Sequence, residues 1–194
     1  LAHYYAERAK GGLGLIIQGA VDVHPASEYW PVPHTRLYEE GSIPSFRRIT
    51  DMVHETDAKI FIELFHVGQA ANARTYGSAP VAPSSITSMV AGTTPKAMEQ
   101  DDIEEAIAAF EQCTINAVAA GYDGIELHAS HGYLLEQFLS PFYNRRDDEY
   151  GGSLDNRMRL LLETLERCRN AAGDNIAFGI RLVADELLPG GLTL

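Results

Sequence analysis

Four short apolar segments alternate along the chain with segments that have helical character. The apolar segments are residues 13–17, 59–65, 124–127 and 175–183. The helical segments are residues 2–10, a second that begins at Ser42, a third from Asp101 to Gly121, and a fourth from Ser153 to Gly173. Strands that alternate with helices are joined by right-handed crossovers and run parallel to one another. The pattern therefore predicts an α/β fold with a parallel sheet.

Polar side chains stand at or near the ends of three of these predicted strands. They are Glu63 and His66, then His128 and His131, and finally Arg181. The C-terminal ends of parallel strands are where an α/β barrel keeps its active site. A closed (β/α)₈ barrel needs about 250 residues, whereas this chain has 194 and begins at Leu1 without an initiator Met. We therefore expect residues 1–194 to be a partial TIM-barrel domain cut from a longer protein.

The longer helical segments each carry a recognisable start and an apolar stripe. Ser42 and Ser153 are suitable N-caps, and Asp101 and Asp102 suit the dipole at the start of the third helix. The expected stripes are Phe46, Ile49, Val53 and Thr56; then Ile103, Ile107, Phe110, Thr114, Ala117 and Val118; then Leu154, Met158, Leu161, Leu162, Leu165 and Cys168.

Three segments are expected to be irregular. Residues 21–41 contain prolines that exclude a long helix, and residues 67–100 are rich in Gly, Pro, Ser and Thr. A loop as long as 67–100 is usually functional or mobile. The third is the stretch between the strand at 124–127 and Ser153. The apolar strand 13–17 favours a position in a sheet covered on both faces.

Composition excludes several classes of function. A formal charge of −12 argues against binding a nucleic-acid backbone, which needs clustered Lys and Arg. We expect no membrane association either, because no apolar run could cross a bilayer and no basic-then-apolar leader is present. Cys113 and Cys168 fall on the expected helix stripes, which favours core positions over a disulfide or metal role. These features are typical of a cytoplasmic protein.

His128, His131 and Tyr133 are the strongest candidates for chemistry. Neutral imidazoles can donate hydrogen bonds to a carbonyl oxygen, and a phenol can deliver a proton. Together they suit a small-molecule substrate with an oxygen to hold and a carbon to protonate. The alternative is structural: one histidine ends the strand and Tyr133 merely packs.

A metal site is the rival hypothesis from another class. His66, Glu126, His128 and His131 offer nitrogen and oxygen donors at adjacent strand ends, which could hold Zn²⁺ for hydrolysis.

Arg181 and Glu63 are charged residues within apolar strands. An unpaired buried charge is costly, so Arg181 needs either an ion pair with Glu63 or Glu126 or an anionic ligand. The glycine-rich residues 150–153 lack the lysine of a phosphate loop, and a tight turn with a helix cap explains them better.

Residues 128–159, with the sequence HASHGYLLEQFLSPFYNRRDDEYGGSLDNRMR, closely resemble the signature of the Old Yellow Enzyme family of FMN oxidoreductases. Three further motifs fit the same family: GLIIQGAVDVHP (14–25), IELFHVGQA (62–70) and PVAPSSI (80–86). The resemblance covers the whole chain and implies strands two to five of a (β/α)₈ barrel. It also implies FMN as the cofactor and NAD(P)H as the reductant. The parent protein would be a homo-oligomer, and any iron–sulfur cluster would lie outside this chain.

The resemblance implies a role for six residues. His128 and His131 would bind the oxygen of an activated alkene, and Tyr133 would be the proton donor. The cofactor-binding residues would be Arg181 beside the flavin N1/O2 edge, Ala20 where the backbone approaches the flavin, and Glu63.

Two positions depart from the family pattern, because Glu63 stands where Gln is usual and Gln69 where Arg is common. Oxidative amine demethylation by the same flavin chemistry is the alternative within the family, and an inert piece of barrel is the non-catalytic one.

Overall fold

The computed structural model describes residues 1–194 except 28–34, 72–78, 89–91 and 175. The strands are β1 (Leu15–Asp22), β2 (Lys59–Phe65), β3 (Val81–Ala82), β4 (Lys96–Ala97), β5 (Gly124–Ala129) and β6 (Ala177–Leu182). The helices are α1 (Ala2–Lys10), α2 (Ile43–Val53), α4 (Gln100–Ala119), α5 (Leu134–Leu139) and α6 (Leu154–Ala172). Short 3₁₀ turns are η1 (Pro25–Ser27), η2 (Glu40–Ser42) and η3 (Gly68–Ala70).

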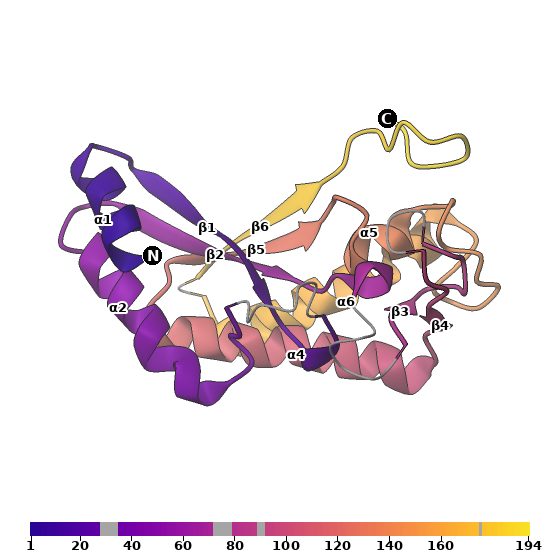
Figure 1. The fold of residues 1–194 in the computed structure, drawn as a ribbon, viewed down its shortest axis with the longest axis horizontal. Coiled ribbons are helices and arrows are strands. Elements are labelled where there is room, and N and C mark those ends of the chain that lie inside the picture. Colours follow the sequence, from indigo (N-terminus) through magenta and orange to yellow (C-terminus); the bar gives the residue numbers. More distant parts are fainter. Residues whose placement is uncertain (28–34, 72–78, 89–91, 175) are drawn as a thin grey trace.

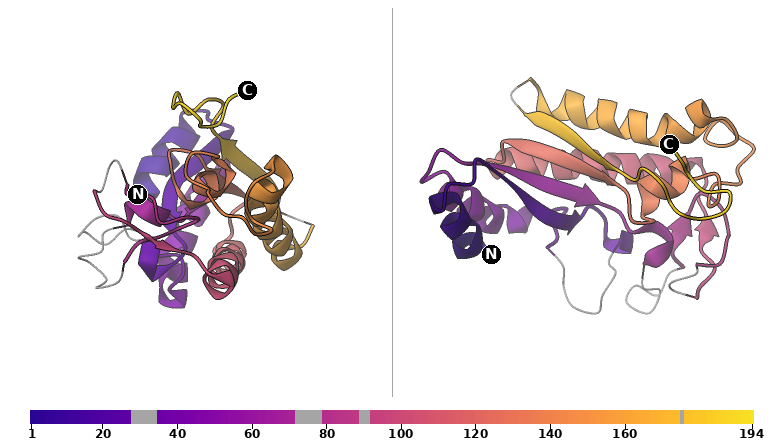
Figure 2. Two further views of the ribbon diagram at one scale, coloured as in Figure 1. Left: turned by 90° about the vertical axis from the view of Figure 1, so that its right-hand side faces the viewer. Right: turned by 90° about the horizontal axis from the view of Figure 1, so that it is seen from above.

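The long strands form one parallel sheet in the order β1-β2-β5-β6, which confirms the predicted α/β alternation. Helices α2, α4 and α6 lie along one face of this sheet (Figure 1). The main core lies between them and includes Ile60 and Ile62 of β2 and Phe110 of α4. The other face is called here the open face, because no helix of the described residues lies above it in Figure 1 or in the turned views of Figure 2.

Strand β1 is longer than the predicted 13–17. Its register with β2 shifts between Gln18 and Val21, so that Gly19 and Ala20 both stand opposite Glu63. Such a bulge is common beside active sites. The expectation that both faces of this strand are covered was wrong, since Leu15 and Ile17 are exposed on the open face.

The segment after β5, expected to be irregular, contains the short helix α5. All six residues of α5 are buried. A helix buried on every side has no polar stripe, so periodicity could not reveal it. Residues 67–100, which were predicted to be a long loop, contain η3, β3 and β4. Part of that predicted loop, residues 72–78 and 89–91, lies outside the described residues.

The helix starts follow the prediction in two cases of three. Ser153 caps α6 by accepting a hydrogen bond from the N–H of Asn156 at 3.2 Å. A capping box formed by Glu99 and Asp102 begins α4. The prediction for Ser42 was wrong: its backbone is helical, and its side chain makes no capping hydrogen bond.

The predicted apolar stripe matches the buried face for most of α4. In α6 the buried face is rotated about the helix axis relative to the predicted stripe. Leu161 and Cys168 are buried as predicted, but Leu154 and Leu162 are each 51% exposed. The buried face of α6 consists of Leu160, Leu161, Thr164 and Cys168. In α4, Val118 is exposed, and Thr56 lies beyond the end of α2. Cys113 and Cys168 are buried free thiols. None of the described helices is long and apolar enough to span a membrane.

Candidate active site

His128 lies at the C-terminal end of β5 and is 3% exposed. Its Nδ1 is 3.0 Å from the hydroxyl oxygen of Ser130, and its Nε2 is 3.1 Å from Nδ1 of His131. Burial, together with the nearby His131 and Arg181, lowers the pKa of His128 to about 4. The ring is therefore neutral near pH 7, where it can donate one hydrogen bond and accept another.

The turn after β5 brings the three predicted residues together. His131 and Gly132 both have left-handed backbones, with φ of 60° and 74°. This conformation is uncommon for a residue other than glycine. The ring centroids of His131 and Tyr133 consequently lie 4.9 and 5.1 Å from that of His128. The expected His128–His131–Tyr133 cluster is therefore present.

Phe65, at the end of β2, forms an apolar wall for this cluster. Its ring lies 5.4 Å from that of Tyr133 and 6.2 Å from that of His128. Ala20 and Tyr133 both pack against the small apolar group that contains Phe65. Sequence reasoning did not single out Phe65. The strand alternation that puts it on the same side of β2 as Glu63 could have found it.

Glu63 and Glu126 are register partners on the neighbouring strands β2 and β5. Arg181 of β6 joins both, with Nε 2.7 Å from Oε2 of Glu63 and Nη2 2.9 Å from Oε1 of Glu126. Burial, with a contribution from Glu126 that Arg181 opposes, raises the pKa of Glu63 to about 7.

The expectation that Arg181 is buried was wrong. Its side chain is 43% exposed, because β6 is one of the two edge strands of the sheet and Arg181 extends over the open face. Both ion pairs considered from the sequence are present. Part of the guanidinium remains accessible to a ligand.

The residues of the zinc hypothesis are not arranged as a metal site. His66 is buried, its ring stacks 6.0 Å from that of His24, and its Nδ1 accepts a hydrogen bond from the N–H of Gly68. Burial lowers the pKa of His66 to about 3. Within the described ranges, no group of three or more His, Cys, Asp or Glu side chains could hold a metal ion.

Other residues on the open face fit a flat cofactor with an anionic edge. Arg181 supplies a partly exposed cation, and Glu63 supplies a carboxyl group beside it. At the bulge of β1, a Cβ atom on Gly19 would meet nothing within 4 Å, and Ala20 is half-buried. Small side chains at a strand end allow a planar group to approach the backbone closely.

A parallel sheet with helices on one face and ionisable groups at its C-terminal strand ends defines part of a (β/α)₈-barrel enzyme. The whole chain, residues 1–194, matches the NADH:flavin oxidoreductase / NADH oxidase family. The chain belongs to this family, which confirms the Old Yellow Enzyme resemblance predicted from the motifs.

Two curated relatives support this assignment. The chain is 41% identical over 195 residues to an NADH oxidase of Thermoanaerobacter brockii, a match that covers 100% of this chain and 30% of the relative. It is 37% identical over 188 residues to 12-oxophytodienoate reductase 1 of Oryza sativa subsp. japonica, with 93% and 49% covered. The chain thus spans half the length of these relatives or less.

Solved structures agree. Old Yellow Enzyme from Pichia sp. AKU4542 superposes with a TM-score of 0.83 at 31% identity, covering 92% of this chain and 50% of the other. Histamine dehydrogenase from Rhizobium sp. 4-9 superposes with a TM-score of 0.93 at 31% identity, covering 99% and 29%. The partial barrel predicted from four strands is therefore confirmed.

Proposed function

We propose that the protein containing this chain is an FMN-dependent oxidoreductase that reduces an activated alkene, such as an enone or enoyl thioester, at the expense of NAD(P)H. The observation that carries the proposal is the contact of His128, His131 and Tyr133 at one strand end. FMN, when bound, supplies the hydride chemistry.

The histidine pair binds the oxygen that activates the alkene. His128 is neutral and hydrogen-bonded to His131, so the pair can present an N–H to a carbonyl oxygen. Hydrogen bonds to that oxygen stabilise the negative charge that develops there during reduction.

Tyr133 is the proton donor. Its ring is held between Phe65 and His128, with its backbone at the start of α5. A phenol held in this way can protonate the carbon next to the one that receives the hydride.

Arg181, Glu63 and Ala20 would hold FMN. The accessible part of the Arg181 guanidinium suits the edge of the ring system that becomes negative on reduction. The carboxyl of Glu63 can accept a hydrogen bond from a ring N–H, and in its protonated form can also donate one.

Oxidation of an amine by the same flavin chemistry, as in an amine demethylase or dehydrogenase, is the second candidate. The similarity to histamine dehydrogenase favours it. A single-turnover experiment distinguishes the two candidates, because an enone oxidises reduced flavin, whereas an amine substrate reduces oxidised flavin.

The test is Tyr133→Phe in the FMN-loaded full-length protein. The variant should reduce its flavin with NADH at the wild-type rate and pass electrons to 2-cyclohexenone about 10²–10⁴-fold more slowly, the usual contribution of a general acid. Tyr4→Phe is the matched control, because Tyr4 is exposed on α1, away from the β5 strand end. A solvent isotope effect on enone reduction would show that proton transfer limits the rate. If the Tyr133 variant then reduced the enone at the wild-type rate, Tyr133 would not be the proton donor.

A further inference from the structure

Glu136 and Gln137 are neighbours in α5 and are almost fully buried, at 3% and 0% exposure. Buried polar side chains need hydrogen-bond partners. Glu136 accepts a hydrogen bond from the N–H of Gly132 through Oε2 at 2.6 Å, and Gln137 donates one from Nε2 to the carbonyl of Gly132 at 2.5 Å. Both polar backbone groups of Gly132 are therefore held by consecutive side chains, an arrangement called here the Gly132 clamp.

The position of Gly132 gives the clamp its significance. Gly132 lies between His131 and Tyr133, and it continues the left-handed backbone that begins at His131. A left-handed residue other than glycine is strained and persists only where its surroundings hold it. The directions in which the imidazole of His131 and the phenol of Tyr133 leave the backbone depend on this turn.

Gln137 also connects the turn to the loop after β2. Its Nε2 donates to the carbonyl of Val67 at 3.2 Å, and its Oε1 accepts from the N–H of Gln69 at 3.3 Å. A Cβ atom added to Gly68 would lie only 2.3 Å from Oε1 of Gln137. Gly68 thus leaves the space in which this amide connects two strand-end loops.

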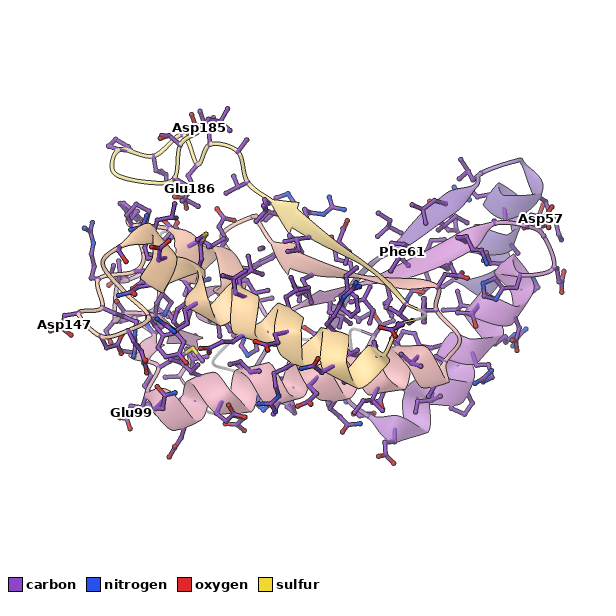
Figure 3. All side chains as sticks on the ribbon, turned by 180° about the vertical axis from the view of Figure 1, so that it is seen from behind. Asp57, Phe61, Glu99, Asp147, Asp185 and Glu186 are labelled. Carbon is purple, nitrogen blue, oxygen red and sulfur yellow. The ribbon has the colours of Figure 1, made fainter. Side chains whose placement is uncertain are left out.

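Glu136 is suited to accept from Gly132 in either protonation state. Burial raises the pKa of Glu136 to about 7; the hydrogen bond from Gly132 opposes this shift, and Glu186 adds to it. Glu186 lies on the C-terminal segment that follows β6 (Figure 3) and accepts a hydrogen bond from the hydroxyl of Ser140 at 2.7 Å. A carboxyl group retains an acceptor oxygen after protonation.

We propose that Glu136 and Gln137 are positioning residues that hold Gly132 and thereby orient His131 and Tyr133 toward the substrate without touching it. This inference rests on the proposed alkene reduction. It adds that α5 serves the site through its two buried polar side chains.

The test compares variants of the FMN-loaded full-length protein. Glu136→Leu and Gln137→Met remove the clamp, Glu136→Gln keeps an acceptor for the N–H of Gly132, and Gly68→Ala displaces the Gln137 amide. Asn116→Leu is the control for general loss of stability. It removes a different buried hydrogen bond, from Asn116 of α4 to the carbonyl of Leu37 at 2.7 Å, which involves no residue of the clamp.

Each protein is reduced with dithionite and reoxidised in single turnovers by 2-cyclohexenone or by oxygen. We expect reoxidation by the enone to slow about 10–100-fold in Glu136→Leu and Gln137→Met, because small misplacements of catalytic groups have effects of this order. The flavin content and the rate of reoxidation by oxygen should stay within about twofold of the wild-type values, since the reaction with oxygen needs neither His131 nor Tyr133. Glu136→Gln should recover most of the enone rate, and Gly68→Ala should behave like Gln137→Met.

Amide hydrogen exchange at Gly132 is the second measurement, and it is independent of activity. It should be faster in Glu136→Leu than in the wild type and unchanged in Asn116→Leu. The proposal is overturned if the clamp variants lose as much rate with oxygen as with the enone, or if Asn116→Leu loses as much enone rate as they do. It is also overturned if Glu136→Leu keeps the wild-type enone rate although exchange at Gly132 is faster.

The two proposals fail in different ways. A wild-type protein that reacts with oxygen but not with the enone counts against alkene reduction, and Gly132 exchange then decides the clamp alone. Unchanged exchange in Glu136→Leu would overturn the clamp, and faster exchange would support it. If Glu136→Leu does not fold, Gln137→Met and Gly68→Ala provide the same comparison.

Discussion

Replacing Glu63 by Gln should stabilise the protein at alkaline pH and change little at acid pH. The pKa of Glu63 is about 7 in the folded protein, against an ordinary value of 4.5. Between these values the folded state holds a proton that the unfolded chain has released. Because the folded state binds more protons, the free energy of unfolding falls as the pH rises through this window.

The magnitude follows from the size of the shift. One pKa unit corresponds to about 1.4 kcal/mol, so a rise from 4.5 to about 7 means that ionised Glu63 costs the folded state at most about 3.5 kcal/mol above pH 7. The side chain is only 8% exposed, so water screens this cost little. Gln has the same shape as protonated Glu and cannot ionise. The variant should therefore gain up to about 3.5 kcal/mol at pH 8.5 and almost nothing at pH 4.5.

The assay is urea unfolding of the FMN-free protein, followed by circular dichroism at both pH values. Glu104→Gln is the matched control, because Glu104 also pairs with an arginine, Arg167, but its side chain is 58% exposed. That change should alter stability by less than about 1 kcal/mol at either pH. If the ion pair of Glu63 with Arg181 is instead essential, breaking it should cost roughly 3–5 kcal/mol at pH 8.5. A loss of that size at alkaline pH would refute the reasoning.

Two further predictions concern stability and protonation. Gly151→Ala should lower the free energy of unfolding by about 1–3 kcal/mol, the usual effect of overpacking, because its Cβ would lie 2.2 Å from the backbone oxygen of Arg146. Gly14→Ala, where a Cβ meets nothing within 4 Å, should have little effect in the same urea assay, and equal effects would contradict the packing argument. His66, whose pKa burial lowers to about 3, should stay neutral from pH 5 to 8. Its imidazole ¹⁵N shifts should then be constant over that range, and a titration centred near 6.5 would show that the ring is solvated.

The sequence was sufficient for the features that depend on local order. The alternation of apolar runs with helices predicts parallel strands, and parallel strands bring their C-terminal ends to one edge. His128 and Tyr133 lie five residues apart at such an end, so their contact could be predicted without coordinates. The motif resemblance identified the family for the same reason, because these residues are contiguous in the sequence.

Other features depend on neighbours that are distant in the sequence. The exposure of Arg181 depends on which strand lies at the edge of the sheet, and no residue near Arg181 encodes this. Helix α5 has no amphipathic period, because all six of its residues are buried, with α6, β5, β3 and η3 in contact with it. Glu136 and Gln137 consequently look like an exposed polar face in the sequence, although they are buried.

Arg181 connects the two halves of the candidate site. It is the register partner of His128 across β5 and β6, and it bridges Glu63 and Glu126. A cation disfavours a second cation and favours an anion nearby. The same guanidinium therefore contributes to the lowered pKa of His128 and opposes the raised pKa of Glu63. The arrangement therefore helps to keep the imidazole of His128 neutral for hydrogen bonding. The part of the cation that is left exposed is available to a ligand that gains negative charge, as a flavin does on reduction.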